Sequence, residues 1–214
     1  YSTTSGSSNI FIGTASGYNN TTGYWNIMLG RATGQYNTTG YANIIIGDYS
    51  GNKNTIGTNN VLVGDYAGGF NTTGSQNVFI GASAGLNNTT GGYNTYIGYH
   101  AGYSGTAASG SNNIFLGVEA GLSNTIGFDN IAIGNQAGRS NVDGTYNVMV
   151  GPSAGRLNVS GDYNTMLGYK AGENQVGDYA TLLGYNAGNS TTSGNSQTMV
   201  GYEAGRYNIG SFNT

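Results

Sequence analysis

Five residues recur along the chain at intervals of seventeen: NIFIG at 9–13, NIMLG at 26–30, NIIIG at 43–47 and NVLVG at 60–64. The glycine that ends each copy marks one repeat, and a second glycine follows every marker by four residues. A constant period of this length predicts a solenoid, in which each repeat buries its apolar face only against its neighbours. The intervals depart from 17 only twice, with 19 and 16 residues. The markers are Gly13, Gly30, Gly47, Gly64, Gly81, Gly98, Gly117, Gly134, Gly151, Gly168, Gly184 and Gly201.

The three residues before each marker form an apolar triplet, and their types predict a strand. The first is β-branched in every repeat, and such side chains suit a pleated strand. The first and third lie on one face of a strand, so the sequence predicts that these two columns form the solenoid core. The columns are Ile10, Ile27, Ile44, Val61, Val78, Thr95, Ile114, Ile131, Val148, Thr165, Thr181 and Thr198, and Ile12, Leu29, Ile46, Val63, Ile80, Ile97, Leu116, Ile133, Val150, Leu167, Leu183 and Val200.

The middle residue of each triplet is then expected to point outward, as a stripe of large apolar side chains that needs a cover. One way to cover it is another layer of the same chain. The interpretation favoured by the sequence is a symmetric oligomer of identical rods that meet along this stripe. The predicted oligomer interface is Phe11, Met28, Ile45, Leu62, Phe79, Tyr96, Phe115, Met149, Met166, Leu182 and Met199, with Ala132 in the same column.

The other half of each repeat reads approximately N-T-T-G. Thr exchanges with Val in one column, from Thr21 to Val142, Val159 and Val176, which predicts methyl groups that face inward. Recurrent Asn at the corners predicts a hydrogen-bonded ladder that satisfies turn backbone groups. The chain holds no Asn-Gly pair and a single Asp-Gly pair, at 143–144, so parallel coiling is favoured over hairpins.

Composition narrows the classes of function. The 214 residues include 40 Gly, 18 Tyr and no Cys, with a formal net charge of -3. Few basic residues argue against nucleic acid as a partner, and no apolar run has the length of a membrane helix. The single His100 suggests no nucleophile and base pair, and the acidic residues are scattered. We therefore expect no enzyme activity, no cofactor and no metal site.

The repeat N-Φ-Φ-Φ-G-x-x-A, where Φ is apolar, resembles the N-S-V-A-I-G-x-x-A repeats in the YadA-like head of trimeric autotransporter adhesins. Similar N-T-T-G-x-x-N-T repeats occur in bacteriophage tail-fibre proteins. The resemblance spans all twelve repeats and implies an all-β, left-handed parallel β-roll, packed as a homotrimer and displayed outside a cell or virion for attachment. In that family the repeat is shorter, its inward pair corresponds to positions such as Ile10 and Ile12, and its middle residue is usually Ala where this chain has Phe11.

Aromatic and charged columns outside the triplets are candidates for a ligand surface. Tyr can grip sugar faces or protein surface, although it also stacks on itself in flanking positions of strands. Arg139 and Arg156 share a column with Glu173, which indicates a solvated charge ladder more than an anion site. The 19-residue repeat carries its extra length in 102–112, an edge that tolerates change. The candidate ligand surface is Tyr146, Tyr163, Tyr179, Tyr169, Tyr185, Tyr202, Arg139 and Arg156.

Taken together, the sequence predicts one repeat domain over residues 1–214, a segment of a longer fibre, that extends, assembles and attaches at a cell or virion surface. A host glycan or protein is the expected partner besides the chain itself. Two alternatives remain: a structural filament subunit without a ligand, and an ice-binding solenoid whose Thr columns order water. The triplets N-x-S/T at Asn20, Asn37, Asn71, Asn88, Asn158 and Asn189 arise from the repeat and indicate glycosylation only in a glycosylating export route.

Overall fold

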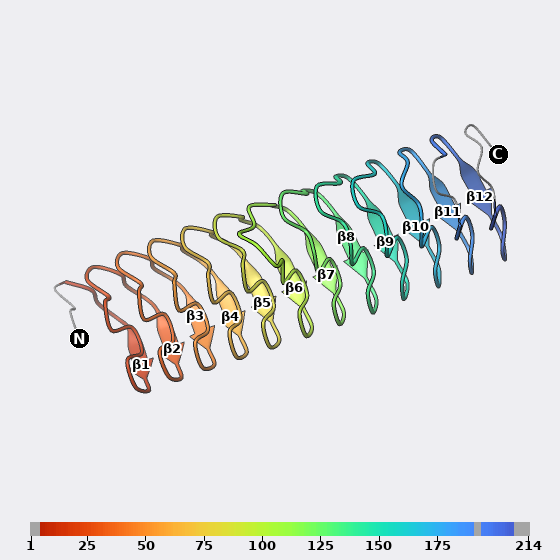
Figure 1. Cartoon of the computed structure of the whole chain (residues 1–214). Coiled ribbons are helices and arrows are strands. Elements are labelled where there is room, and N and C mark those ends of the chain that lie inside the picture. The colour runs from red at the N-terminus through yellow and green to blue at the C-terminus, as the bar shows by residue number, and fades with distance from the viewer. Residues whose placement is uncertain (1–4, 191–193, 208–214) are drawn as a thin grey trace.

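The chain winds into a rod of stacked coils, each one repeat long. The structure is a computed structural model, and it describes residues 5–190 and 194–207. Within these residues twelve parallel strands form one sheet in chain order, with no crossover (Figure 1). The all-β parallel solenoid predicted from the period is thereby confirmed. The strands are β1 Ile10–Ile12, β2 Ile27–Leu29, β3 Ile44–Ile46, β4 Val61–Val63, β5 Val78–Ile80, β6 Thr95–Ile97, β7 Ile114–Leu116, β8 Ile131–Ile133, β9 Val148–Val150, β10 Thr165–Leu167, β11 Thr181–Leu183 and β12 Thr198–Val200.

Equivalent residues of neighbouring repeats lie directly beside one another. Phe11 pairs with Met28 and Phe79 pairs with Tyr96, so the strands are in register. Backbone hydrogen bonds between coils continue beyond the strands, as where the Gly34 N–H donates to the Ser50 carbonyl at 3.0 Å. Each coil is therefore held to the next around its circumference, which a single repeat could not achieve alone.

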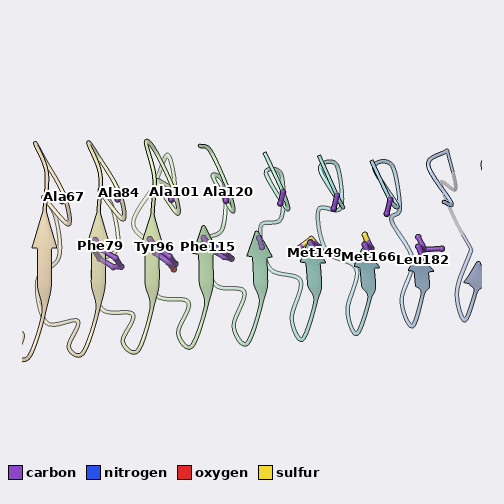
Figure 2. Close-up of a cluster of buried hydrophobic side chains, with 14 of the residues drawn as sticks. Ala67, Phe79, Ala84, Tyr96, Ala101, Phe115, Ala120, Met149, Met166 and Leu182 are labelled. Carbon is purple, nitrogen blue, oxygen red and sulfur yellow. The ribbon is translucent and has the colours of Figure 1, made fainter. Parts of the chain in front are cut away.

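The interior of the rod is one side chain wide, and the middle residue of each triplet fills it. Met28, Ile45, Leu62, Phe79 and their equivalents are buried, and only Phe11, in the first coil, is partly exposed. An Ala column lines the other side of this core, including Ala84 and Ala101 (Figure 2). The interior thus holds one large and one small column.

The predicted direction of the triplet is therefore wrong. The side chains predicted as an exposed oligomer interface point into the coils and form the core, so neither a partner rod nor a second layer of the chain covers them. They are Phe11, Met28, Ile45, Leu62, Phe79, Tyr96, Phe115, Met149, Met166, Leu182 and Met199, together with Ala132. The first and third residues, predicted as core, lie outside it in every strand.

The second glycine of each repeat explains this direction. A Cβ placed on Gly34 would lie 2.5 Å from the Met28 sulfur, and one on Gly17 would lie 2.8 Å from the Phe11 ring. The large side chain therefore occupies the space that the glycine leaves, and the coil has no room for a second layer. β-Branched residues recur at the flanking positions because they suit a strand backbone on either face. Met suits the middle position because its flexible side chain fills irregular gaps.

Two columns of buried Asn replace an apolar core on the remaining sides of each coil. Asn43 accepts from the Asn60 backbone N–H at 3.0 Å and donates to the Gly57 carbonyl at 2.9 Å. In the second column the Asn37 amide donates to the Asn20 side-chain oxygen at 2.7 Å. The predicted Asn ladder is confirmed, and it satisfies backbone carbonyls that turns would otherwise leave buried without a partner.

The Thr column is half-buried and forms hydrogen bonds, contrary to the prediction of a methyl-lined interior. The Thr21 hydroxyl donates to the Thr38 carbonyl at 3.0 Å, and Thr38 repeats this contact with Thr55. Val159 and Val176, in the same column, are exposed. The Thr side chains of this column therefore contribute hydrogen bonds between successive coils and are not part of the apolar core.

Candidate functional site

The outward face of the twelve strands carries an apolar surface along the rod. We call it the strand face: the first and third residues of β1–β12. No residue of the strand face is buried, and each is Ile, Val, Leu or Thr. A soluble monomer rarely exposes a continuous apolar patch of this length. The sequence predicts an exposed apolar stripe on the middle residue of each triplet. In the structure the exposed apolar residues are instead the first and third of each triplet.

Two tyrosine ladders flank the strand face near the C-terminal end of the rod. Tyr163 lies two residues before β10, and Tyr169 lies two residues after it. Neighbouring rings of Tyr146, Tyr163 and Tyr179 are stacked with centroids 4.9 and 5.2 Å apart. The structure thus brings together the tyrosines that the sequence predicts in consecutive repeats.

The second ladder has the same construction on the other side of the strands. Tyr169, Tyr185 and Tyr202 stack with centroids 5.2 Å apart at both steps. Within each ladder the ring faces lie against one another, so a ligand approaching from the side meets ring edges and hydroxyl groups. The ladders therefore suit hydrogen bonding and edge contacts more than stacking on a sugar face.

The first ladder also rests on an uncommon backbone conformation. Tyr146, Tyr163 and Tyr179 have φ between 56° and 59°, in the left-handed region, and Trp25 and Tyr93 share this position and conformation in other coils. The sequence gives little sign of it, because residues other than Gly, Asn and Asp rarely adopt positive φ. Here the coil geometry imposes the conformation, and stacking between coils offsets part of its cost.

Stacking also alters the acidity of one ladder residue. Partial desolvation, followed by interactions with Tyr146, Tyr179 and Asp162, raises the pKa of Tyr163. The hydroxyl group of Tyr163 therefore stays protonated at neutral pH and can donate a hydrogen bond.

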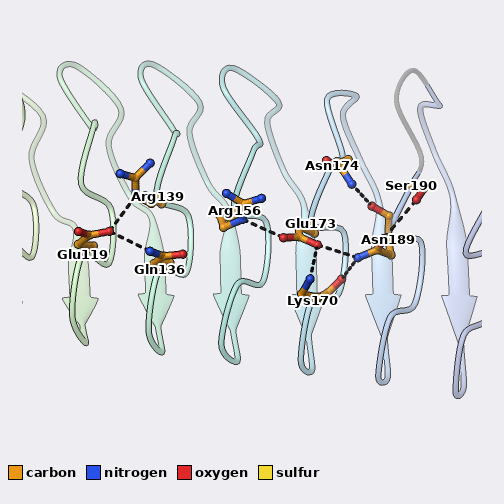
Figure 3. A network of polar contacts seen from close by, with 9 residues as sticks. All are labelled: Glu119, Gln136, Arg139, Arg156, Lys170, Glu173, Asn174, Asn189 and Ser190. Atoms are coloured by element: carbon orange, nitrogen blue, oxygen red, sulfur yellow. Dashed lines mark hydrogen bonds and ion pairs between the residues drawn. The ribbon is translucent and has the colours of Figure 1, made fainter.

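The two arginines of the candidate surface each have a carboxylate partner (Figure 3). Arg139 Nε lies 2.8 Å from Glu119 Oε2, and Arg156 Nε lies 2.8 Å from Glu173 Oε1. The sequence predicts the column shared by Arg139, Arg156 and Glu173 but misses Glu119, because that partner lies 20 residues away and in a different column. Because each arginine is paired with a carboxylate, this column is better described as a ladder of ion pairs than as a binding site for an anion.

Glu173 is the most enclosed acid of this network. Its side chain accepts from Arg156, from Lys170 Nζ at 3.3 Å and from the Asn189 amide at 3.0 Å. Burial opposes its ionisation, but the hydrogen bonds from Arg156, Asn189 and Lys170 outweigh burial and lower its pKa. At Glu119 the hydrogen bond from Arg139 is the largest cause of a lowered pKa, against a smaller effect of burial. Both carboxylates are therefore ionised at neutral pH.

His100 lies in an aromatic cluster and packs against its neighbours. Its ring centroid is 3.8 Å from that of Tyr99 and 4.6 Å from that of Tyr103. Among the described residues no group of three or more His, Cys, Asp or Glu side chains is arranged to hold a metal ion. The absence of enzyme activity stays a prediction.

The 19-residue coil accommodates its extra residues on the outside. Gly105, Thr106 and Ala107 are exposed, and the chain then rejoins its neighbour through a bridge between Asn88 and Ala108. The 19-residue coil has no Asn in the column that contains Asn71 and Asn88. Asn88 Oδ1 therefore has no amide from the next coil to accept from, and it is buried without a hydrogen-bond partner. The insertion therefore interrupts the Asn column that contains Asn71 and Asn88, while the sheet of twelve strands stays intact.

The N-x-S/T triplets at Asn20, Asn37, Asn71, Asn88, Asn158 and Asn189 lie on the inside of the rod, whereas Asn19 and Asn87, which also begin such triplets, are half-buried. The Asn side chains of all six are buried, and those of Asn20, Asn37, Asn71, Asn88 and Asn158 donate to a turn carbonyl of their own coil. A glycan on any of these nitrogen atoms would have to displace the ladder. The folded chain therefore offers no room for glycosylation at these positions.

Within residues 5–190 and 194–207 no helix has the length and apolar character needed to cross a membrane. Comparison of the chain with protein-family models, with characterised proteins and with solved structures finds no match.

Proposed function

We propose that the chain is a module of a fibre displayed outside a cell or on a virion, where it acts as a spacer and attaches to a surface without catalysis. The observation that carries this proposal is the uninterrupted series of in-register coils. Eleven steps of about 4.8 Å give a rod of about 53 Å. Strands β1 and β12 lie at opposite ends of it, which suits a part that holds two others at a fixed distance (Figure 1).

Self-association is part of this proposal, and three chains is the number that the resemblance favours. An exposed apolar strand face supports association of copies, because such a surface is stabilised when it leaves water. A homotrimer of solenoids would also be stiffer than a single rod, which suits a fibre.

Attachment is proposed to involve the two tyrosine ladders, with a host glycan or protein as the ligand. The ladders present aromatic edges and hydroxyl groups beside the small polar side chains of the turns, a combination found in adaptable binding surfaces. The Tyr49–Tyr66 stack, with centroids 5.0 Å apart, lies several coils away and offers a matched control.

The test is a binding screen of the assembled protein against glycans and cell surfaces, with ladder variants. Replacing Tyr163 and Tyr179 by Ser, or Tyr169 and Tyr185 by Ser, should abolish binding. Replacing Tyr49 and Tyr66 should not. A screen without any binding would argue for the alternative of a structural filament subunit, which the apolar strand face also supports.

The ice-binding alternative is less favoured by the hydrogen bonds of the Thr column. Hydroxyl groups such as those of Thr21 and Thr38 donate to carbonyls of the next coil. They are therefore not free to organise water in a regular array. Measurable thermal hysteresis would restore this alternative.

A further inference from the structure

The strand face differs from every other side of the rod in its chemistry. Its 24 positions hold only aliphatic residues and Thr, while all 15 charged residues of the chain lie outside the strands. Ile44 in β3 and Ile114 in β7 are 39% and 38% exposed, although each has a neighbouring strand on both sides. Stacking along the rod thus shields part of each side chain and leaves the outward part in water.

The face is also regular. All strands have three residues and equal register, so the side chains form two straight columns along the rod. The turn glycines keep the coils close: a Cβ on Gly47, which has a φ of 123°, would lie 2.5 Å from the Gly64 carbonyl oxygen. Sheets pack face to face about 10 Å apart, with interdigitated side chains.

We infer that a second copy of this chain packs on the strand face and covers its two aliphatic columns. The inference rests on the self-association in the proposed function and assigns it to residues that the sequence places inside the rod. A second copy fits because its coils have the same spacing of about 4.8 Å, so that side chains of both copies can interlock along the whole rod. A partner of another fold would match this spacing only locally.

The area of the face agrees with a stable contact between copies. Its length of about 53 Å and width of about 10 Å give about 500 Å² on each copy, or about 1,000 Å² for two. Specific interfaces begin at about this size. Charged residues border the apolar columns, as with the Arg31–Asp48 ion pair at 3.5 Å, which gives the polar rim that interfaces usually have.

The contact should be centred on β1–β9. The first position of those strands is Ile or Val except in β6, whereas in β10–β12 it is Thr165, Thr181 and Thr198. The tyrosine ladders flank these last strands, and the first ladder extends to Tyr146 beside β9. The two surfaces therefore divide the rod, with assembly along most of its length and attachment near one end.

The experiment compares two double variants of the full chain by light scattering and sedimentation. Ile44→Lys with Ile114→Lys places two charges on the strand face, four coils apart. Ile56→Lys with Ile126→Lys is the matched control, since these isoleucines are 52% and 58% exposed, have the same separation and lie outside the strands. We expect the face variant to dissociate, with a Kd about 100-fold higher or more, and the control to keep the wild-type mass.

Circular dichroism of both variants checks that the β structure persists. A milder double variant is Ile44→Thr with Ile114→Thr, because β6 and β10 already have Thr at the first position of the strand. This variant should weaken assembly by a smaller factor. A monomeric wild-type chain, or equal masses for face variant and wild type, would overturn the inference. Loss of ligand binding in a correctly assembled protein would instead count against the proposed attachment and leave the interface standing.

Discussion

Met149 fills the space that Ala132 leaves in the neighbouring coil. A Cβ placed on Gly138, which belongs to the coil of Ala132, would meet the Met149 methyl carbon at 2.7 Å and the Ala132 methyl at 3.4 Å. Met149 therefore packs the core of two coils, which explains how one small residue is tolerated in a column of large ones.

Replacing Met149 by Ala should consequently destabilise the rod more than replacing Met166. Either change removes a buried side chain and should cost about 2–5 kcal/mol. The Met149 variant also joins its cavity to the position of Ala132, so we expect about 1 kcal/mol of additional loss. Chemical denaturation of both variants measures the difference, and equal stabilities would contradict this account of the core.

Replacing Gly85 by Ala should be strongly destabilising, because two effects act together. Gly85 has a φ of 58°, and its added Cβ would lie 2.5 Å from the Phe79 ring. Left-handed backbone and overpacking should together cost about 3 kcal/mol. Gly105→Ala is the control: nothing lies within 4 Å of that Cβ, so stability should change by less than about 1 kcal/mol. Similar melting temperatures for the two variants would show that the core is not as narrow as described.

Gln175 and Ala180 form a compensating pair. In regular coils two Asn amides serve one turn carbonyl, as Asn43 and Asn54 do at Gly57. Ala180 has no amide to offer Gly194, and the longer Gln175 donates to that carbonyl at 2.9 Å. Gln175→Ala should therefore cost about 1–3 kcal/mol.

Ala180→Asn should recover part of that loss, which a double-mutant cycle in denaturant can measure. We expect a coupling of about 1 kcal/mol between the two positions. Strictly additive effects would indicate that the two side chains do not share the carbonyl.

Stability should fall in acid through Glu173 and Glu119. Their pKa values are lowered from 4.5 in the folded chain, so the unfolded chain binds protons more readily as the pH drops. Their contribution is complete above about pH 4.5 and is lost as the pH falls through the folded values. Thermal unfolding followed from pH 7 to pH 2 should show this loss, and Glu173→Gln should lower the melting temperature at pH 7 and make the curve flatter. A variant with an unchanged curve would exclude Glu173 as a cause.

The period and the residue types were sufficient to predict parallel coils, the strand positions and the Asn ladder, because each follows from stacking like residues. The direction of the triplet could not be predicted from β propensity, since Ile10 and Ile12 suit either face of a strand. The signal that could have decided it is the glycine four residues after each marker, which leaves room for one large side chain. The ion pair of Arg139 with Glu119 was beyond reach, because the two residues are 20 positions apart and so do not share a column of the repeat.

Since each coil contacts only the next, the rod is a tandem array whose members are nearly interchangeable. Unequal recombination between such similar stretches of a gene can add or remove one unit of seventeen codons and leave the remaining units undisturbed. Every unit gained would move the far end outward by about 4.8 Å. The length of the rod could thus evolve in small, equal increments without the redesign of any contact.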